Sequence, residues 1–166
     1  MPRHQPDRPA VMGLDLSLTR TGVALPSGET FSVVPTTGSE DRGKRLHEIW
    51  LGIATWLNMC AGGDRYGPTP ELVAIERYNP GGVQGFTMAH LGELGGVVRC
   101  NLAARGIAWL EVPPATIKKL ATGHGNANKE EMIAAARAAG ATVANSDEAD
   151  AYWLREWGHR HLGGTL

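Results

Sequence analysis

The sequence predicts one α/β domain built around a five-stranded mixed sheet with helices on its flanks. The chain has 166 residues, which suits a single domain with a substantial core. Hydrophobic residues make up 42% of it, an ordinary value for a globular protein. Short β-rich runs dominate the first part of the chain, and strands then alternate with helical segments, which is the pattern of an α/β sheet.

The first three strands are expected to form an antiparallel meander. Residues 11–15 (VMGLD) are an apolar run of strand character that ends in a carboxylate. After the turn-like segment SLTRTG, two further β-rich runs cover residues 23–26 and 30–34, separated by the turn PSGE. Three short strands with such short connections favour antiparallel pairing.

The middle of the chain alternates helix and strand. In residues 41–60 the apolar side chains recur at helical spacing, and residues 84–105 form a second long helical segment. The apolar runs at residues 72–76 (LVAIE) and 107–112 (IAWLEV) are the fourth and fifth strands, which we expect to pair in parallel.

Two glycines in the second helical segment indicate a close contact. Gly92 and Gly96 lie four residues apart on one side of it, although a glycine inside a helix costs about 0.5–1 kcal/mol relative to alanine. Another backbone is therefore expected to pack there. It belongs either to the chain's own sheet or to a second subunit, and the sequence leaves both possibilities open.

Three helices are expected at the C-terminal end. Residues 115–121 form a short helix, and residues 129–140 form a clear one that ends at a glycine. The last helix covers residues 147–162, with Asn145 or Ser146 as its cap. Acidic residues fill its first turn, where the helix dipole favours them.

Composition excludes several classes of protein. Residues 1–10 are polar and Pro-rich, which predicts a flexible tail before a domain over residues 11–166, without a secretory signal. Cys60 and Cys100 form no CxxC or zinc-binding pattern, so we expect buried free thiols in a reducing cytoplasm, the host's if the gene is viral. The net charge of −1 argues against simple electrostatic coating of nucleic acid, and more weakly against a nuclease with an acidic metal site.

Four acidic residues carry the strongest chemical signal. Asp15 and Glu76 each end a strongly apolar strand, where an ionised carboxylate is costly unless it is paired, hydrated or metal-bound. Asp147 and Asp150 lie three apart at a helix start and so share one helix face. If the two strands are neighbours and the last helix crosses their ends, all four carboxylates converge.

Such a cluster of oxygen ligands suits Mg²⁺ or Mn²⁺. Two such ions, about 3.5–4 Å apart, can stabilise the attacking and the leaving oxygen of a phosphodiester. Each acid alone has a simpler interpretation: Asp15 can start a turn, and Asp147 or Asp150 can be an ordinary charge at a helix start. Their order along the chain distinguishes the two interpretations.

Four segments, in this order, resemble motifs of the RuvC-type Holliday junction resolvases of the ribonuclease H-like superfamily. VMGLDLSLTRTGVAL resembles their first strand-turn-strand unit, and LVAIE resembles their second acidic strand. PPATIKKLATGHGNANKEEM resembles their basic segment, and DEADAYWL resembles their closing Asp-x-x-Asp helix. The similarity extends over residues 11–157, and it fits a bacterial or a phage-encoded member equally well.

The resemblance implies a ribonuclease H-like fold and a Mg²⁺-dependent crossover junction endodeoxyribonuclease of recombination and repair. It also implies a homodimer that makes paired nicks in four-way or branched DNA, with Mn²⁺ as a substitute metal and two ions per active site. The implied metal ligands are Asp15, Glu76, Asp147 and Asp150. The lysines implied near the scissile phosphate are Lys118 and Lys129.

Other residues are candidates for DNA contacts, and here the chain departs from the family. Lys119 can touch phosphates beside Lys118, and His124 can contact DNA or assist proton transfer. The family places an aromatic residue after the second acid to stack on a crossover base, but Asn79 fills that position here. Tyr78, one residue earlier, and Phe86 are the candidates for stacking. The family's Pro-Gly after the first Asp is replaced by Leu16-Ser17.

Three alternatives remain at this stage. A related ribonuclease H-like nuclease of the YqgF group would act on RNA or general branched DNA. A non-catalytic junction-binding module of the same fold would not need the acids. GLDLSLTRTGVAL also resembles the first phosphate-binding hairpin of the sugar kinase and actin superfamily, but those proteins need two such domains and a second Gly-rich loop, which the sequence lacks.

Overall fold

The computed structural model describes residues 8–62, 65–78 and 85–164, so most of the tail expected over residues 1–10 lies outside the described part. The elements follow the order that the sequence predicts. The strands are β1 (Val11–Asp15), β2 (Thr21–Ala24), β3 (Thr30–Val33), β4 (Leu72–Glu76) and β5 (Ala108–Val112). The helices are α1 (Arg42–Ala61), α2 (Gly85–Ala104), α3 (Pro114–Thr122), α4 (Lys129–Ala138) and α5 (Ser146–Leu162).

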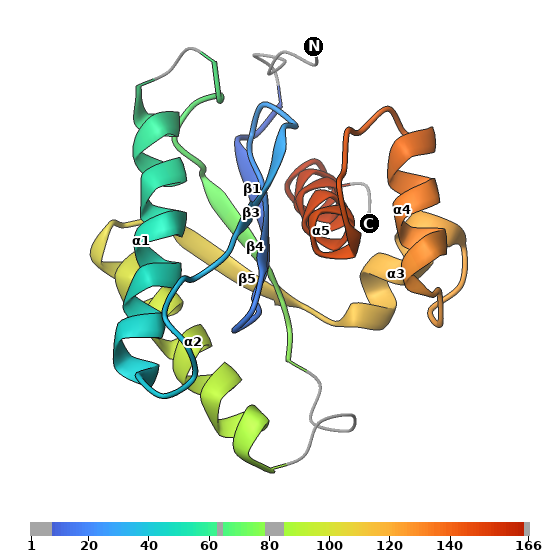
Figure 1. The fold of residues 1–166 in the computed structure, drawn as a ribbon. Coiled ribbons are helices and arrows are strands. Elements are labelled where there is room, and N and C mark those ends of the chain that lie inside the picture. Colours follow the sequence, from blue (N-terminus) through green and yellow to red (C-terminus); the bar gives the residue numbers. More distant parts are fainter. Residues whose placement is uncertain (1–7, 63–64, 79–84, 165–166) are drawn as a thin grey trace.

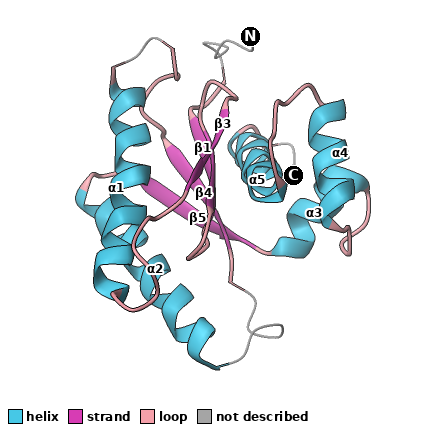
Figure 2. Ribbon diagram, viewed as in Figure 1, coloured by secondary structure: helices cyan, strands magenta, loops and turns pink. Residues whose placement is uncertain are grey.

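The strands form one mixed sheet in the order β3-β2-β1-β4-β5. β1, β2 and β3 pair antiparallel, whereas β4 pairs in parallel with both β1 and β5. This is the predicted arrangement of three antiparallel strands followed by two parallel ones. Helices α1 and α2 cover one face of the sheet, and α3, α4 and α5 lie on the other (Figures 1 and 2).

The alternation of side chains along the strands divides the core between these two faces. Met12 and Leu14 of β1 pack in the cluster that includes the apolar side chains of α1 and α2. Ala74 of β4 belongs to the second cluster, with Met132 of α4 and Leu154 of α5. Odd-numbered positions of β1 and even-numbered positions of β4 therefore face α5.

Glycines allow α5 to lie directly on the sheet. A Cβ at Gly13 of β1 would collide with the carbonyl oxygen of Ala151, and one at Gly22 of β2 would collide with the carbonyl oxygen of Asp147. Further along α5, a Cβ at Gly158 would approach Val11 Cγ1 to 2.6 Å. The helix therefore packs closely along β1, with its first turn over Gly22.

The structure corrects several details of the sequence analysis. β2 begins at Thr21, inside the segment predicted to be a turn, because it pairs with β1 from Gly22 opposite Asp15. Cys60 is buried as predicted, but Cys100 is exposed, because it lies on the side of α2 that faces away from the sheet. Of the two proposed caps of α5, Asn145 is the one that accepts the Glu148 N–H.

The two helical glycines do not pack against the chain's own sheet. A Cβ at Gly92 or at Gly96 would meet nothing within 4 Å. Both residues are exposed on α2, as is Cys100 further along the helix. Among the described residues, packing against the chain's own sheet therefore does not account for these glycines, which favours the second-subunit interpretation.

Within the described ranges, every helix is too short or too polar to serve as a candidate membrane span.

Candidate active site

The ends of β1 and β4 place two of the four acids beside each other. The two strands are parallel neighbours, with Leu14 opposite Ile75, so Asp15 and Glu76 end adjacent strands at the same edge. Side chains two residues apart on a strand point to the same face of the sheet. Asp15 therefore shares its face with Gly13, and Glu76 shares its face with Ala74, and this is the face that α5 covers. Both acids are partly buried.

The first turn of α5 adds the other two acids to this edge. Asp15 pairs with Gly22 across β1 and β2, and the Asp147 carbonyl lies against Gly22. Asp150 follows one helical turn later on the same face of α5. The topology thus brings together acids that lie up to 135 positions apart in the sequence, between Asp15 and Asp150.

The pKa values of Asp15, Glu76 and Asp150 are all raised, as expected for buried carboxylates that lie close together. Burial raises the pKa of Asp15 well above its ordinary value, and the carboxylates of Glu76, Asp150 and Asp147 raise it further. Burial, assisted by the Asp150 carboxylate, raises the pKa of Glu76 to about 7. Burial likewise raises the pKa of Asp150 to about 6, with a contribution from Asp147. The site is therefore a group of mutually repelling carboxylates in a poorly solvated position.

Two lysines face the carboxylates and partly offset this repulsion. Lys118 of α3 lowers the pKa of both Glu76 and Asp150. Lys129, the first residue of α4, lowers the pKa of Asp15 and Asp150. The structure thus places both sequence-predicted lysines close enough to the acids to interact with them electrostatically.

The donor set fits a hard divalent cation. All of the candidate ligands are carboxylate oxygens, which Mg²⁺ and Mn²⁺ prefer. The Oδ1 atom of Asp150 is buried and has no hydrogen-bond partner among the described residues, so an electropositive ligand would satisfy it. In the described part of the chain, however, no three acidic, histidine or cysteine side chains are already arranged as a set of metal ligands. The carboxylates are neighbours, not a preformed ligand shell.

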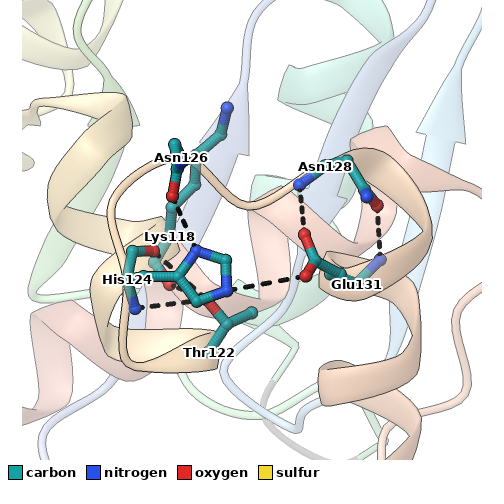
Figure 3. Close-up of polar contacts among 6 residues, drawn as sticks. All are labelled: Lys118, Thr122, His124, Asn126, Asn128 and Glu131. Atoms are coloured by element: carbon teal, nitrogen blue, oxygen red, sulfur yellow. Dashed lines mark hydrogen bonds and ion pairs between the residues drawn. The ribbon is translucent and has the colours of Figure 1, made fainter.

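The loop between α3 and α4 is held closed by its own side chains (Figure 3). The ring of His124 lies 2.8 Å from Asn126 Oδ1 through Nδ1 and 3.5 Å from Glu131 Oε1 through Nε2. Asn128 and Glu131 form a capping box at the start of α4. These contacts tie the loop to the start of α4, between the helices that carry Lys118 and Lys129. The His124 ring is engaged within the loop, which favours a role in holding it together.

A cleft of about 550 Å³ opens beside the carboxylates. It extends from Asp15 and Glu76 toward α2, where Gly92 and Arg99 line it. Tyr78 also lines this cleft, and its hydroxyl oxygen is buried with no hydrogen-bond partner in the described ranges. Asn79 and the Phe86 side chain lie outside the residues that the structure describes.

Lys119 does not join the acidic cluster. Its neighbour Lys118 is half-buried and faces Glu76 and Asp150, whereas Lys119 is exposed and lines a separate groove with Trp157 of α5. One helix turn thus presents its two lysines to different surroundings. The structure also brings Arg99, paired with Glu111 at 2.6 Å, to the cleft beside the acids.

The raised pKa of Glu76 leads to a prediction about stability without metal. Folding raises the pKa of Glu76 from an ordinary value of 4.5 to about 7. The free energy of unfolding is therefore highest, with respect to this carboxyl, below pH 4.5, and this stability is lost as the pH rises through 7. At pH 8 the buried charge costs free energy, which Glu76→Gln removes. In EDTA at pH 8, we expect Glu76→Gln to raise the midpoint of thermal unfolding by about 2–6 °C.

Differential scanning fluorimetry at two pH values checks this expectation. The gain should disappear at pH 4.5, where the wild-type carboxyl is largely protonated. Added Mn²⁺ should stabilise the wild type more than the variant. If Glu76→Gln lowers the midpoint at pH 8 in EDTA, the carboxylate stabilises the fold and the electrostatic description of the site is wrong.

Comparisons with known proteins agree with this geometry. The family model for crossover junction endodeoxyribonuclease RuvC matches residues 11–152, a segment that includes all four acids and both lysines. The chain is 31% identical over 132 residues to RuvC of Corynebacterium diphtheriae, covering 74% of this chain and 75% of that protein. It is 30% identical over 166 residues to RuvC of Paraburkholderia phytofirmans, covering 94% and 86%.

A solved structure has the same fold. RuvC of T. thermophilus, determined in complex with a Holliday junction substrate, superposes with a TM-score of 0.69 over 94% of this chain and 96% of that one. The sequences are 23% identical in this alignment, so the likeness bears on the fold. It supports the ribonuclease H-like fold that the motif resemblance implies.

Proposed function

The chain belongs to the RuvC family of crossover junction endodeoxyribonucleases, and we propose that it resolves four-way (Holliday) junctions by metal-dependent hydrolysis of paired phosphodiester bonds. The observation that carries this proposal is the meeting of Asp15, Glu76 and Asp150 at one edge of the sheet, where each is poorly solvated. Such carboxylates are costly unless they bind a cation. An interaction module without catalysis would have no need of them.

Asp15, Glu76, Asp147 and Asp150 are proposed to hold Mg²⁺, with Mn²⁺ as a substitute and two ions per site. Bound divalent ions would supply positive charge to the oxygen of the attacking water and to the 3′-oxygen that leaves the phosphodiester. The carboxylates would hold these charges at fixed positions, and burial keeps bulk water from screening them.

Lys118 and Lys129 are proposed to act on the phosphate itself. Each is near the carboxylates from the side of α3 or α4, and each is a compact point charge suited to a phosphodiester transition state. The hydrogen bonds of the α3–α4 loop order the backbone between the two helices that carry these lysines.

The remaining DNA contacts are proposed at the margins of this site. Lys119 would bind phosphate from the outer side of α3, and His124 would lie at the tip of the loop beside the DNA. Tyr78, in the cleft, would lie against an unstacked base near the crossover. These contacts would position the junction, whereas the acids and the two lysines would carry the chemistry.

We also propose that the active species is a homodimer, because two symmetric cuts need two sites and two-fold pairs are the commonest soluble oligomers. The exposed side of α2 around Gly92 and Gly96 is the proposed contact. A Cβ added at Gly92 would meet no described atom of its own subunit within 4 Å. We therefore expect Gly92→Leu to weaken dimerisation without unfolding the domain.

Gly43 of α1 provides a matched control for this prediction. It is another exposed helical glycine, and the nearest atom to a Cβ there lies 4.0 Å away. In sedimentation analysis at micromolar concentration, the wild type and Gly43→Leu should have twice the chain mass of 17.7 kDa, and Gly92→Leu should shift toward 17.7 kDa. Unchanged dimerisation of Gly92→Leu would exclude this side of α2 as the contact.

The substrate class is tested by one panel of nucleic acids. With Mg²⁺, we expect rapid cleavage of four-way DNA junctions, slower cleavage of flaps, and little cleavage of linear duplex DNA or structured RNA. Preferred cleavage of RNA, or equal cleavage of all branched DNA, would instead support an activity of the YqgF type. Metal-free junction binding with no cleavage in any metal would indicate a binding module.

A further inference from the structure

A buried glutamate lies between the two acids of α5. Glu148 is 6% exposed, although a carboxylate in such a position is costly unless its oxygens are hydrogen-bonded. It is the residue directly after Asp147 and lies two before Asp150. Because successive residues of a helix point about 100° apart, its side chain leaves α5 in a different direction from Asp147.

The Glu148 carboxylate connects the start of α5 to the edge strand β3. Its Oε1 atom accepts a hydrogen bond of 2.7 Å from the Ser32 hydroxyl. Its Oε2 atom lies 3.2 Å from the Thr30 hydroxyl, whose single proton is shared with the Thr142 carbonyl oxygen at 2.8 Å. Both hydroxyls belong to β3 and lie more than 110 positions away from Glu148 in the sequence. This is a tertiary contact and not a local helix cap.

The same carboxylate also fixes the segment that leads into α5. It accepts hydrogen bonds from the Ala144 N–H at 2.9 Å and from Asn145 Nδ2 at 3.3 Å. Asn145 in turn caps the helix by accepting the Glu148 N–H at 3.0 Å and donates to Ser32 Oγ at 3.0 Å. The first turn of α5, its cap and β3 thus form one hydrogen-bonded unit centred on Glu148.

This unit and the glycine contact hold the helix start at two points. On one side the Asp147 carbonyl lies against Gly22 of β2, and on another Glu148 is held by β3. Together they restrict how far α5 can tilt or rotate over the sheet. Asp147 and Asp150 move with this turn, whereas Asp15 and Glu76 are fixed by the strands.

We propose that Glu148 is a positioning residue, which sets the distance and orientation of Asp147 and Asp150 relative to Asp15 and Glu76. The inference rests on the proposed metal-dependent nuclease function. The helix dipole favours an acid anywhere in the first turn of α5, so charge alone does not distinguish Glu148 from Asp147. What distinguishes Glu148 is the hydrogen bond that its carboxylate accepts from β3.

Three substitutions separate position from charge. Glu148→Gln keeps the length of the side chain but leaves an amide NH₂ facing hydrogen-bond donors. Glu148→Asp keeps the charge but withdraws the carboxylate from Ser32 and Thr30 by one methylene. Ser32→Ala keeps Glu148 intact and removes its shortest hydrogen bond to β3. A positioning role predicts that all three impair the site, whereas a role of the charge alone predicts that Glu148→Asp restores it.

Glu48 of α1 offers a matched control outside the site. Its carboxylate also accepts hydrogen bonds from two threonine hydroxyls and from backbone N–H groups, those of Thr36 and Thr37. Glu48→Gln therefore disturbs a network of the same kind. We expect it to leave metal binding and cleavage unchanged.

Mn²⁺ affinity, measured by calorimetry on the protein without DNA, is the primary readout. We expect Glu148→Gln and Glu148→Asp to weaken Mn²⁺ binding about tenfold, the lower end of the effect of losing a residue that orients metal ligands, with a smaller loss for Ser32→Ala. For junction cleavage, kcat should fall while KM stays at the wild-type value. Adding Ser32→Ala to Glu148→Gln should cause little further loss, because both act on one contact.

The outcomes distinguish this inference from the function on which it rests. If Asp15→Asn abolishes cleavage but the Glu148 variants bind Mn²⁺ like Glu48→Gln, then Glu148 has no positioning role and the nuclease assignment stands. If Asp15→Asn leaves cleavage intact, the nuclease assignment itself fails. If the Glu148 variants do not fold, Ser32→Ala decides alone, and wild-type Mn²⁺ affinity in that variant would overturn the proposal.

Discussion

Asp15→Asn is expected to lower the rate of junction cleavage about 10³-fold or more, since a metal site contributes several kcal/mol and each 1.4 kcal/mol is worth about tenfold. Asp15 is the acid whose pKa is influenced by all three of the other candidate ligands. The substitution removes a ligand charge with little change of shape. Single-turnover cleavage of a labelled four-way junction in Mg²⁺ measures the effect.

Binding and folding should survive this substitution. Without metal, junction affinity should stay the same or increase, because one negative charge near the DNA phosphates is lost. Asp41→Asn is the matched control: Asp41 caps α1 through the Lys44 N–H, and asparagine caps helices equally well. Normal cleavage by Asp15→Asn would mean that the site has been wrongly assigned.

Replacing the metal should have a comparably large effect. We expect cleavage in Mg²⁺ or Mn²⁺, none in EDTA, and very little in Ca²⁺. All of the proposed ligands are oxygens, so Ca²⁺ should also bind, but its longer bonds and looser geometry would misalign the reacting oxygens. Cleavage assays across the three metals, together with a titration of the bound ion, test both statements.

Competition between the metals provides a control for this result. If Ca²⁺ occupies the same carboxylates, then increasing Ca²⁺ should inhibit cleavage at fixed Mn²⁺, and excess Mn²⁺ should restore it. Full activity in EDTA would exclude a mechanism that depends on a metal. Failure of Ca²⁺ to inhibit would indicate that it binds elsewhere.

The sequence predicted the fold and the acidic edge because both depend on local patterns. Two apolar strands that end in Asp15 and Glu76, and a capped helix that starts with Asp147, can be recognised without tertiary information. The order of the strands then makes adjacent parallel strands the simplest arrangement. The structure has that arrangement, with Leu14 opposite Ile75.

What the sequence could not predict depends on contacts between distant segments. Gly22 lies in a segment that reads as a turn, and only the register of β2 and the path of α5 explain why a side chain is excluded there. Glu148 reads as one more acid in a helix start, although the Asn145-x-x-Glu148 spacing hints at a cap. Its partners Ser32 and Thr30 become visible only when α5 crosses the sheet.

Cys100 was predicted to be buried but is exposed. A cysteine in an apolar helical segment is usually buried, but α2 has its outer side uncovered within the subunit, and Cys100 lies on that side. The sequence shows which residues are apolar or small. It does not show which side of a helix a second subunit would cover.

The most direct test of the central claim is the cleavage of a plasmid that extrudes a four-way junction from negative supercoils. A nuclease with two coordinated sites makes both symmetric nicks before it leaves, so linear product should appear in Mg²⁺ without accumulation of nicked circles, and the nicks should map to symmetric positions across the crossover. Asp15→Asn should yield neither product. Nicked circles alone, or nicks scattered through the duplex arms, would contradict the assignment as a junction-resolving endonuclease.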